Sequence, residues 1–138
     1  MDLKDLRTFA EKNFIPILRE DTEKVLIDIL KKENPKTVLE IGTAVGYSGS
    51  IILKNSQCYL TTIEIDENRF AFAKNLFKEN NFTDRVNQIL GDANEILKNL
   101  NKKFDLIFLD GPKGQYLKQL PYLYNLLSDN GTLFADNI

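Results

Sequence analysis

Three side chains that carry oxygen atoms follow two apolar segments near the end of the printed sequence. Asp110 comes directly after one segment, and Asp136 and Asn137 come directly after the next. Two carboxylates and an amide form an all-oxygen ligand set, which suits Mg²⁺, Mn²⁺ or Ca²⁺ and does not suit zinc. Lys113 lies three residues beyond Asp110, so its amine could reach a group bound to such an ion. The simpler alternative is that each aspartate is a cap or turn residue.

Two glycines and one acid form a second candidate site, earlier in the chain. Gly42 and Gly46 follow an apolar segment with the spacing Gly-x-x-x-Gly, which differs from the Gly-x-Gly-x-x-Gly of dinucleotide sites. Glu64 lies 22 residues beyond Gly42, where an acid can accept hydrogen bonds from both hydroxyls of a ribose. The alternatives are a tight turn and a solvent-exposed acid at a strand end. Together these features indicate an adenosine-containing ligand, and ATP is a poor candidate because no Walker-type loop is present.

A third polar pair, Asp92 and Asn94, follows another apolar segment. Either side chain could accept a hydrogen bond from the exocyclic amine of an adenine. An equally good interpretation is that Asp92 is the N-cap of the next helix.

The composition excludes several other kinds of chemistry. The 138 residues include no histidine and one cysteine, Cys58, which excludes histidine-based triads, zinc sites and an internal disulfide. The net charge of −2, from 18 basic and 20 acidic residues, does not favour tight binding to a phosphate backbone. No apolar run is long enough to span a membrane and no signal peptide is present at the start, so we expect a cytoplasmic protein.

Apolar periodicity predicts alternating strands and helices. The predicted strands are 37–41, 59–65, 86–90, 104–109 and 132–135. The predicted helices are 2–13, a second that is capped by Asp21 or Thr22 and ends at 34–35, then 48–54, 66–80 with Asp66 as cap, 93–100 and about 116–127, followed by a turn at 128–131. Pro121 should kink the last helix or mark its first turn. We expect Cys58 to be buried, and Tyr116, Tyr122 and Tyr124 to pack along a helix.

This alternation predicts one α/β domain with a doubly wound parallel sheet. Residues 1–34 would form two N-terminal helices and residues 35–138 the α/β core. In such sheets ligands bind beyond the carboxyl ends of the strands. All three candidate sites lie at those ends, and the last two strands should be neighbours, so the sequence places them on one edge of the sheet.

Five blocks of this sequence resemble the class I S-adenosylmethionine-dependent methyltransferases. More narrowly, they are similar to the cation-dependent O-methyltransferases, the family of the catechol and caffeoyl-CoA O-methyltransferases. The blocks are 39–48, 62–66, 91–93, 104–110 and 135–137, in the order and spacing of the family across about residues 16–138. The resemblance implies a Rossmann-like fold with the sheet order 3-2-1-4-5, and S-adenosylmethionine as the cofactor.

The resemblance also implies roles for individual residues. The cofactor-binding set would be Leu18, Gly42, Ala44, Gly46, Ser48, Glu64, Ile65, Asp92, Ala93 and Asp110. Within it the glycine loop lines the methionine end, Glu64 holds the ribose, and Asp92 and Ala93 flank the adenine. The stretch around Ile17 and Leu18 would pass over the methionine portion.

The predicted catalytic residues are Lys113, as general base, and Asp110. Asp110, Asp136 and Asn137 would hold Mg²⁺, or Mn²⁺ or Ca²⁺ in its place. The acceptor would be a hydroxyl with a vicinal oxygen. Segments 14–17 and 113–116 look like the bacterial branch that methylates 5-hydroxyuridine in tRNA, whereas Gly111 and Pro112 stand where catechol-type members have a His-Trp pair. A small phenol or catechol is the alternative acceptor.

Members of the family continue for tens of residues past the Asp-Asn pair that corresponds to Asp136 and Asn137. We therefore expect a chain that lacks the family's C-terminal strands. A fragment that binds the cofactor without activity is one alternative, and an NAD-binding domain is another. The family also suggests a homodimer.

Overall fold

The structure is a computed structural model that describes residues 1–110 and 113–136, with only the backbone at residues 113 and 114. Five parallel strands form one sheet in the order β3-β2-β1-β4-β5, which confirms the predicted topology. Their bounds are β1 Thr37–Ile41, β2 Tyr59–Glu64, β3 Val86–Leu90, β4 Phe104–Leu109 and β5 Leu127–Ala135. In the described residues no helix has the length and apolar character of a membrane span.

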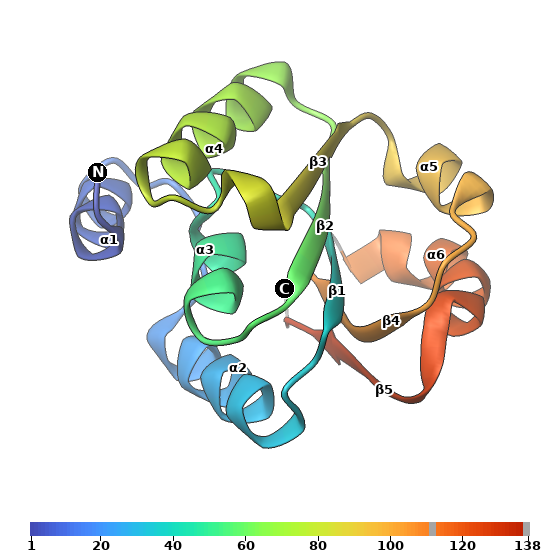
Figure 1. Ribbon diagram of the computed structural model, residues 1–138. Helices are drawn as coiled ribbons and strands as arrows, with labels where there is room; N and C mark the ends of the chain where they lie inside the picture. The colour runs from blue at the N-terminus through green and yellow to red at the C-terminus, as the bar shows by residue number, and fades with distance from the viewer. Residues whose placement is uncertain (111–112, 137–138) are drawn as a thin grey trace.

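Helices cover both faces of this sheet, as Figure 1 shows. The first four lie over one face: α1 Leu3–Lys12, α2 Glu20–Glu33, α3 Tyr47–Lys54 and α4 Glu67–Glu79. The other face carries α5 Ala93–Asn99 and α6 Lys113–Leu126, and a short 3₁₀ turn, η1 Thr83–Arg85, precedes β3. The predicted Asp66 cap is confirmed, because its carboxylate accepts hydrogen bonds from the Asn68 and Arg69 amides, both at 2.9 Å.

Two apolar cores result from the alternation of side chains along the central strands. In β4, Leu106 and Phe108 pack into the core under α1–α4, whereas Ile107 and Leu109 pack into the core under α5 and α6. All four are at most 1% exposed. A strand that is buried on both faces has little polar sequence, which is why 104–109 is apolar at every position except Asp105. Cys58 is buried in the first core, as predicted.

The sequence misplaced several element boundaries. The second helix begins at Glu20 with Arg19 at the N-cap, so neither Asp21 nor Thr22 is the cap. The last helix begins at Lys113 instead of about 116, which places Pro121 inside it. The expected turn at 128–131 instead belongs to β5, at a register shift: Phe104 pairs with Leu127, but Leu106 pairs with Thr132. The extra residues of β5 are accommodated as an irregularity of the ladder.

Candidate functional site

The loop after β1 makes a turn that only glycine can start. Gly42 has φ +95°, and a Cβ at this position would lie 2.2 Å from the carbonyl oxygen of Asp110. The amides of Gly42 and Thr43 both donate to the carbonyl of Ile63, at 2.9 and 3.1 Å. Gly46, with φ +92°, ends the loop as the N-cap of α3. The turn therefore brings the loop backbone against the ends of both β2 and β4.

Glu64 is fixed at the end of β2 by this loop. Its Oε1 accepts a hydrogen bond from the Ala44 amide at 2.7 Å, and its Oε2 accepts one from the Asp66 amide at 3.0 Å. The residue is only 5% exposed, which contradicts the alternative of a solvent-exposed acid. Each carboxylate oxygen can accept a further bond, so the group can still bind donors of a ligand.

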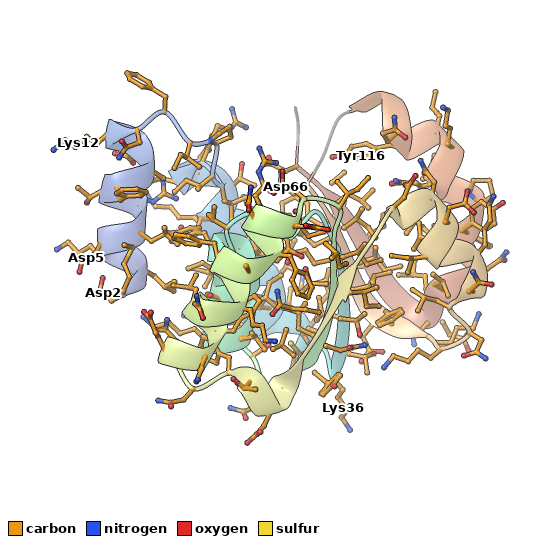
Figure 2. The ribbon with its side chains drawn as sticks, turned by 90° about the horizontal axis from the view of Figure 1, so that it is seen from above. Asp2, Asp5, Lys12, Lys36, Asp66 and Tyr116 are labelled. Carbon is orange, nitrogen blue, oxygen red and sulfur yellow. The ribbon has the colours of Figure 1, made fainter. Side chains whose placement is uncertain are left out.

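A cavity of about 500 Å³ opens at the carboxyl ends of the strands. Seven of the predicted cofactor residues line it: Gly42, Ala44, Glu64, Ile65, Asp92, Ala93 and Asp110. Figure 2 shows the side of the molecule to which it belongs: Asp66 and Tyr116 lie toward one edge, and Lys36, which precedes β1, lies at the opposite edge. These seven residues thus converge on one cavity of the size of a small-molecule site.

The segment between α1 and α2 walls a second, smaller cavity of about 170 Å³. Ile15, Pro16 and Ile17 line it together with Ala44, Val45, Arg69 and Asp110. Ala44, Arg69 and Asp110 line both cavities, so the two adjoin. Ile17 thus lies beside the loop after β1, and its expected place over the methionine portion of the cofactor stays a prediction.

Three predicted cofactor residues, Leu18, Gly46 and Ser48, are not among the residues that line these two cavities. Leu18 is 2% exposed and packs in the core. Ser48 is also buried, and its hydroxyl donates to the carboxylate of Glu40. Their role in ligand binding stays a prediction.

We call residues 42–46 the glycine turn. Glu40 lies beneath it as a fully buried acid, to which the sequence analysis assigned no role. It accepts hydrogen bonds from Ser48 and, at 2.7 Å, from the hydroxyl of Thr62. Thr62 is in turn bonded to the hydroxyl of Thr43. Burial raises the pKa of Glu40 to about 8, although the two hydroxyl groups act in the opposite direction. This network ties β1, β2, the glycine turn and α3 together.

Asp92 has the capping role, since its carboxylate accepts a hydrogen bond from the Asn94 amide at 2.9 Å. It also lines the large cavity, so capping and ligand contact are compatible. The Asn94 side chain donates to Gln115 at 3.1 Å and accepts from Gln119 at 3.2 Å. These bonds connect α5 to α6 across the cavity wall. The Oε1 of Gln119 is buried and has no hydrogen-bond partner in the described part of the chain.

Two acids meet at the other end of the site. The amide of Asp110 donates to Ile41, and the amide of Asp136 donates to Leu109, so the residues continue neighbouring strands. Burial, followed by the charges of Asp136 and Glu64, raises the pKa of Asp110 to about 6. Asp136 is 8% exposed and accepts a hydrogen bond from Thr22 at 3.3 Å. A cation would relieve the repulsion between these carboxylates.

The described residues supply two of the three predicted metal ligands. Asn137 and the side chain of Lys113 lie outside them, so their placement stays a prediction. Within residues 1–110 and 113–136, no three acidic, histidine or cysteine side chains come together as a metal site. The oxygen chemistry of Asp110 and Asp136 fits a hard divalent ion that takes further ligands from elsewhere.

Four cavity residues on helices, Arg69, Gln115, Tyr116 and Gln119, were given no site role by the sequence analysis. Arg69, in the first turn of α4, lines both cavities. Gln119 and Tyr116, on α6, line the large one, and the Tyr116 hydroxyl donates to the carbonyls of Leu109 and Asp136. Tyr116 thus packs at the site, whereas Tyr124 is 80% exposed, so the expected packing of the three tyrosines along a helix does not hold for Tyr124. Apolar spacing gave no signal for the cavity residues, because their positions depend on where each helix begins.

Both the sequence and the structure are similar to those of known methyltransferases. The chain is 31% identical over 112 residues to catechol O-methyltransferase of Sus scrofa, an alignment that covers 73% of this chain and 59% of that enzyme. A crystal structure of a Staphylococcus aureus protein, provisionally named a caffeoyl-CoA O-methyltransferase, superposes with a TM-score of 0.90 at 34% identity, covering 99% of this chain and 66% of that one.

The methyltransferase PaMTH1 of Podospora anserina, with bound SAH, superposes with a TM-score of 0.82 at 30% identity. This match covers 87% of this chain and 53% of that chain. The present chain therefore spans between about half and two thirds of these relatives. The sequence profile described as O-methyltransferase matches residues 1–138. The chain belongs to the O-methyltransferase family.

Proposed function

We propose that the large cavity binds S-adenosylmethionine and that the chain carries the catalytic part of an O-methyltransferase. The observation on which this rests is the position of Glu64, a nearly buried carboxylate that two backbone amides hold at the cavity wall. A ribose presents two neighbouring hydroxyls, which such a carboxylate can accept. PaMTH1, at 30% identity, is a relative with bound SAH.

The cavity wall suits the rest of that cofactor. Gly42 leaves no side chain between the loop backbone and the cavity. Ile63 and Ile65 offer apolar surface. Polar groups at the far wall come from Asp92 and from the side-chain amides of Gln115 and Gln119, which Asn94 bonds. Apolar surface with a few oriented polar groups is the usual composition of a nucleoside site. Bound there, S-adenosylmethionine would supply an electrophilic methyl group on a sulfonium.

We further propose that Asp110 and Asp136, with Asn137, hold a divalent cation beside the acceptor. Such an ion, when bound, would lower the pKa of an acceptor hydroxyl that is otherwise near 10 for a phenol. Asp110 and Asp136 would fix the acceptor through this ion, and Asp110, which also lines the large cavity, would lie next to the cofactor. Lys113 would take the proton that the hydroxyl loses as its oxygen forms a bond to the methyl carbon and the carbon–sulfur bond breaks.

The acceptor would be a hydroxyl with a vicinal oxygen, since two adjacent oxygens match one cation. Both 5-hydroxyuridine in tRNA and a small catechol have this pattern. The similarity to pig catechol O-methyltransferase supports the second, and the acidic composition disfavours a phosphate backbone. The resemblance of segments 14–17 and 113–116 to the tRNA-modifying branch supports the first.

One assay tests the proposal as a whole. The chain is incubated with S-adenosylmethionine labelled in its methyl group and with either total tRNA or a panel of catechols, with and without a chelator. We expect transfer to one acceptor class and its loss with the chelator. Methyl transfer that is unchanged by the chelator would show that no divalent cation takes part in the reaction. A thermal shift with NAD and none with S-adenosylmethionine would overturn the cofactor assignment.

A further inference from the structure

The segment between α1 and α2 walls the small cavity, and its Ile15, Ile17 and Leu18 pack in or against the first core. We call residues 14–18 the strap. Phe14 is 92% exposed and has φ +57°, and the Ile15 amide donates to Ala10 at 2.8 Å. At its other end, the carbonyl of Leu18 accepts a hydrogen bond from the guanidinium of Arg7. The strap is therefore secured by α1 at both ends.

Arg7 connects the strap to two other helices. Its Nη2 lies 3.0 Å from the carboxylate of Glu23 on α2, and its Nε donates to the hydroxyl of Tyr47 on α3 at 3.3 Å. The guanidinium carbon also lies 5.0 Å from the centre of the Tyr47 ring, in a cation–π contact. The Tyr47 hydroxyl donates to Glu23, which closes the cluster. Only a planar group with several donors can satisfy all of these partners together.

Tyr47 places this cluster next to the glycine turn. It is the first residue of α3 and directly follows Gly46, whose amide donates to Thr43 within the turn. One guanidinium thus touches the backbone of the strap and the side chain that follows the turn. Figure 2 shows that Lys12, at the end of α1 from which the strap leaves, lies toward the same edge as Asp66 and Tyr116.

We propose that Arg7 is a positioning residue that holds the strap against the glycine turn before a ligand arrives. The inference rests on the proposed function, because it assigns the small cavity to the methionine end of the cofactor. If the strap were loose, binding would have to order it, and the loss of conformational freedom would weaken affinity. Arg7 would act through Leu18 and Tyr47, without touching the ligand.

The chain offers a matched control in Arg85. This arginine is also partly buried, and it donates to the carbonyls of Leu53, Ser56 and Cys58 at 3.1, 2.7 and 3.2 Å. None of these residues lines the two cavities of the site. Loss of either guanidinium should cost stability, but only loss of Arg7 should change the site.

The experiment compares Arg7→Met, Arg7→Lys and Arg85→Met in the full chain. Trypsin cleavage after Arg19, next to the strap, is timed, and SAH affinity is measured by calorimetry. We expect Arg7→Met to be cleaved faster and to bind about tenfold more weakly, as for a lost charge-assisted contact, with Arg7→Lys in between. Arg85→Met should lose thermal stability but keep the cleavage rate and affinity of the unmodified chain.

Equal cleavage and equal affinity in Arg7→Met and Arg85→Met would overturn the inference. If Arg7→Met fails to fold, Tyr47→Phe replaces it: this variant keeps the ring and loses only the hydroxyl that bonds Arg7 and Glu23. A smaller rise in cleavage and a smaller loss of affinity are then expected, and no change would contradict the proposal. If the unmodified chain does not bind SAH, the proposed function is overturned instead. The trypsin cleavage rates alone then test whether Arg7 holds the strap.

Discussion

The carboxylates at the two ends of the site differ in their hydrogen-bond partners. We call the end with the glycine turn, Glu64 and Asp92 the glycine end, and the end with Asp110 and Asp136 the acidic end. At the glycine end, both carboxylate oxygens of Glu64 accept backbone N–H groups, and Asp92 accepts the amide of Asn94. At the acidic end, the carboxylate of Asp110 has no hydrogen-bond donor among the described residues, and its pKa is raised to about 6 by burial and by two neighbouring acids. Within residues 1–110 and 113–136, one side chain donates to the carboxylate of Asp136, that of Thr22 at 3.3 Å.

This difference shows that the two ends depend on different groups for their organisation. A carboxylate that accepts backbone amides is held in one orientation and is ready to bind a neutral, donor-rich ligand. The carboxylate of Asp110 is costly in the absence of a cation, because burial and the neighbouring charges of Asp136 and Glu64 all oppose its charge. The glycine end is thus organised by the chain itself, whereas the acidic end needs an ion to complete it.

The buried acid beneath the glycine turn gives the largest expected effect. Glu40 has a pKa of about 8 in the fold, against the ordinary value of 4.5 for a glutamate in water. Because the folded pKa is raised, its contribution to stability is complete below about pH 4.5 and is lost as the pH rises through 8. Glu40→Gln should remove this loss, so its free energy of unfolding should exceed that of the unmodified chain at pH 9 by about 2–4 kcal/mol.

Urea unfolding at pH 5, 7 and 9 measures the effect of Glu40→Gln. Glu67→Gln, at an exposed position of α4, is the control and should follow the pH curve of the unmodified chain. Parallel curves for Glu40→Gln and the unmodified chain would contradict the prediction, because they would show that burial does not raise the pKa of Glu40.

Removal of the Glu64 carboxylate should weaken the binding of S-adenosylmethionine by between about tenfold and a hundredfold, as expected for lost hydrogen bonds to a charged group. Glu64→Ala also frees the amides of Ala44 and Asp66, so the turn loses its support. Calorimetric titration measures the affinity, with Glu67→Ala as a nearby control that should bind normally. Unchanged binding by Glu64→Ala would show that the cavity does not hold a ribose.

The elements that the sequence predicted best are those with local causes. Strands 37–41 and 104–109 agree with the structure to the residue, because largely apolar runs between turn residues determine buried strands. The edge strand 86–90 also agrees to the residue, although its sequence is partly polar. The Asp66 cap is equally local. The position of Glu64 at the end of β2 was also predicted, because its distance from Gly42 along the chain is set by one strand–helix–strand unit; its role in ribose binding stays a prediction.

The features that the sequence did not predict depend on contacts between distant segments. Arg7 meets Leu18, Glu23 and Tyr47 only after three helices have packed, and no spacing in the sequence indicates this. The irregular ladder of β5 was predicted as a turn from residues 128–131, which have turn propensity, but pairing with β4 overrides it.

The acidic end should respond to divalent cations where the glycine end does not. Mg²⁺ or Mn²⁺ at about ten times its dissociation constant should raise the melting temperature by about 3–6 °C, because the ion binds the folded chain. Asp136→Asn should abolish this shift while binding S-adenosylmethionine normally, since Asp136 does not line the large cavity. Asp129→Asn, at an exposed position of β5, is the control and should keep the shift. A cation shift that survives in Asp136→Asn would contradict the assignment.

The smallest effect tests whether the far wall of the glycine end is organised as firmly as Glu64. Asn94→Ala removes the side chain that links Gln115 and Gln119, and it leaves the buried amide of Gln119 without this acceptor. We expect a loss of about 1 kcal/mol in the free energy of unfolding and a few-fold weaker binding of S-adenosylmethionine. Asn99→Ala is the matched control, because Asn99 lies on the same helix, is exposed and bonds only the carbonyl of Glu95. If both variants keep normal affinity, the side-chain amides of Asn94, Gln115 and Gln119 hold α5 and α6 together but do not contact the ligand. The part of the site that the chain itself organises is then confined to the glycine turn and Glu64.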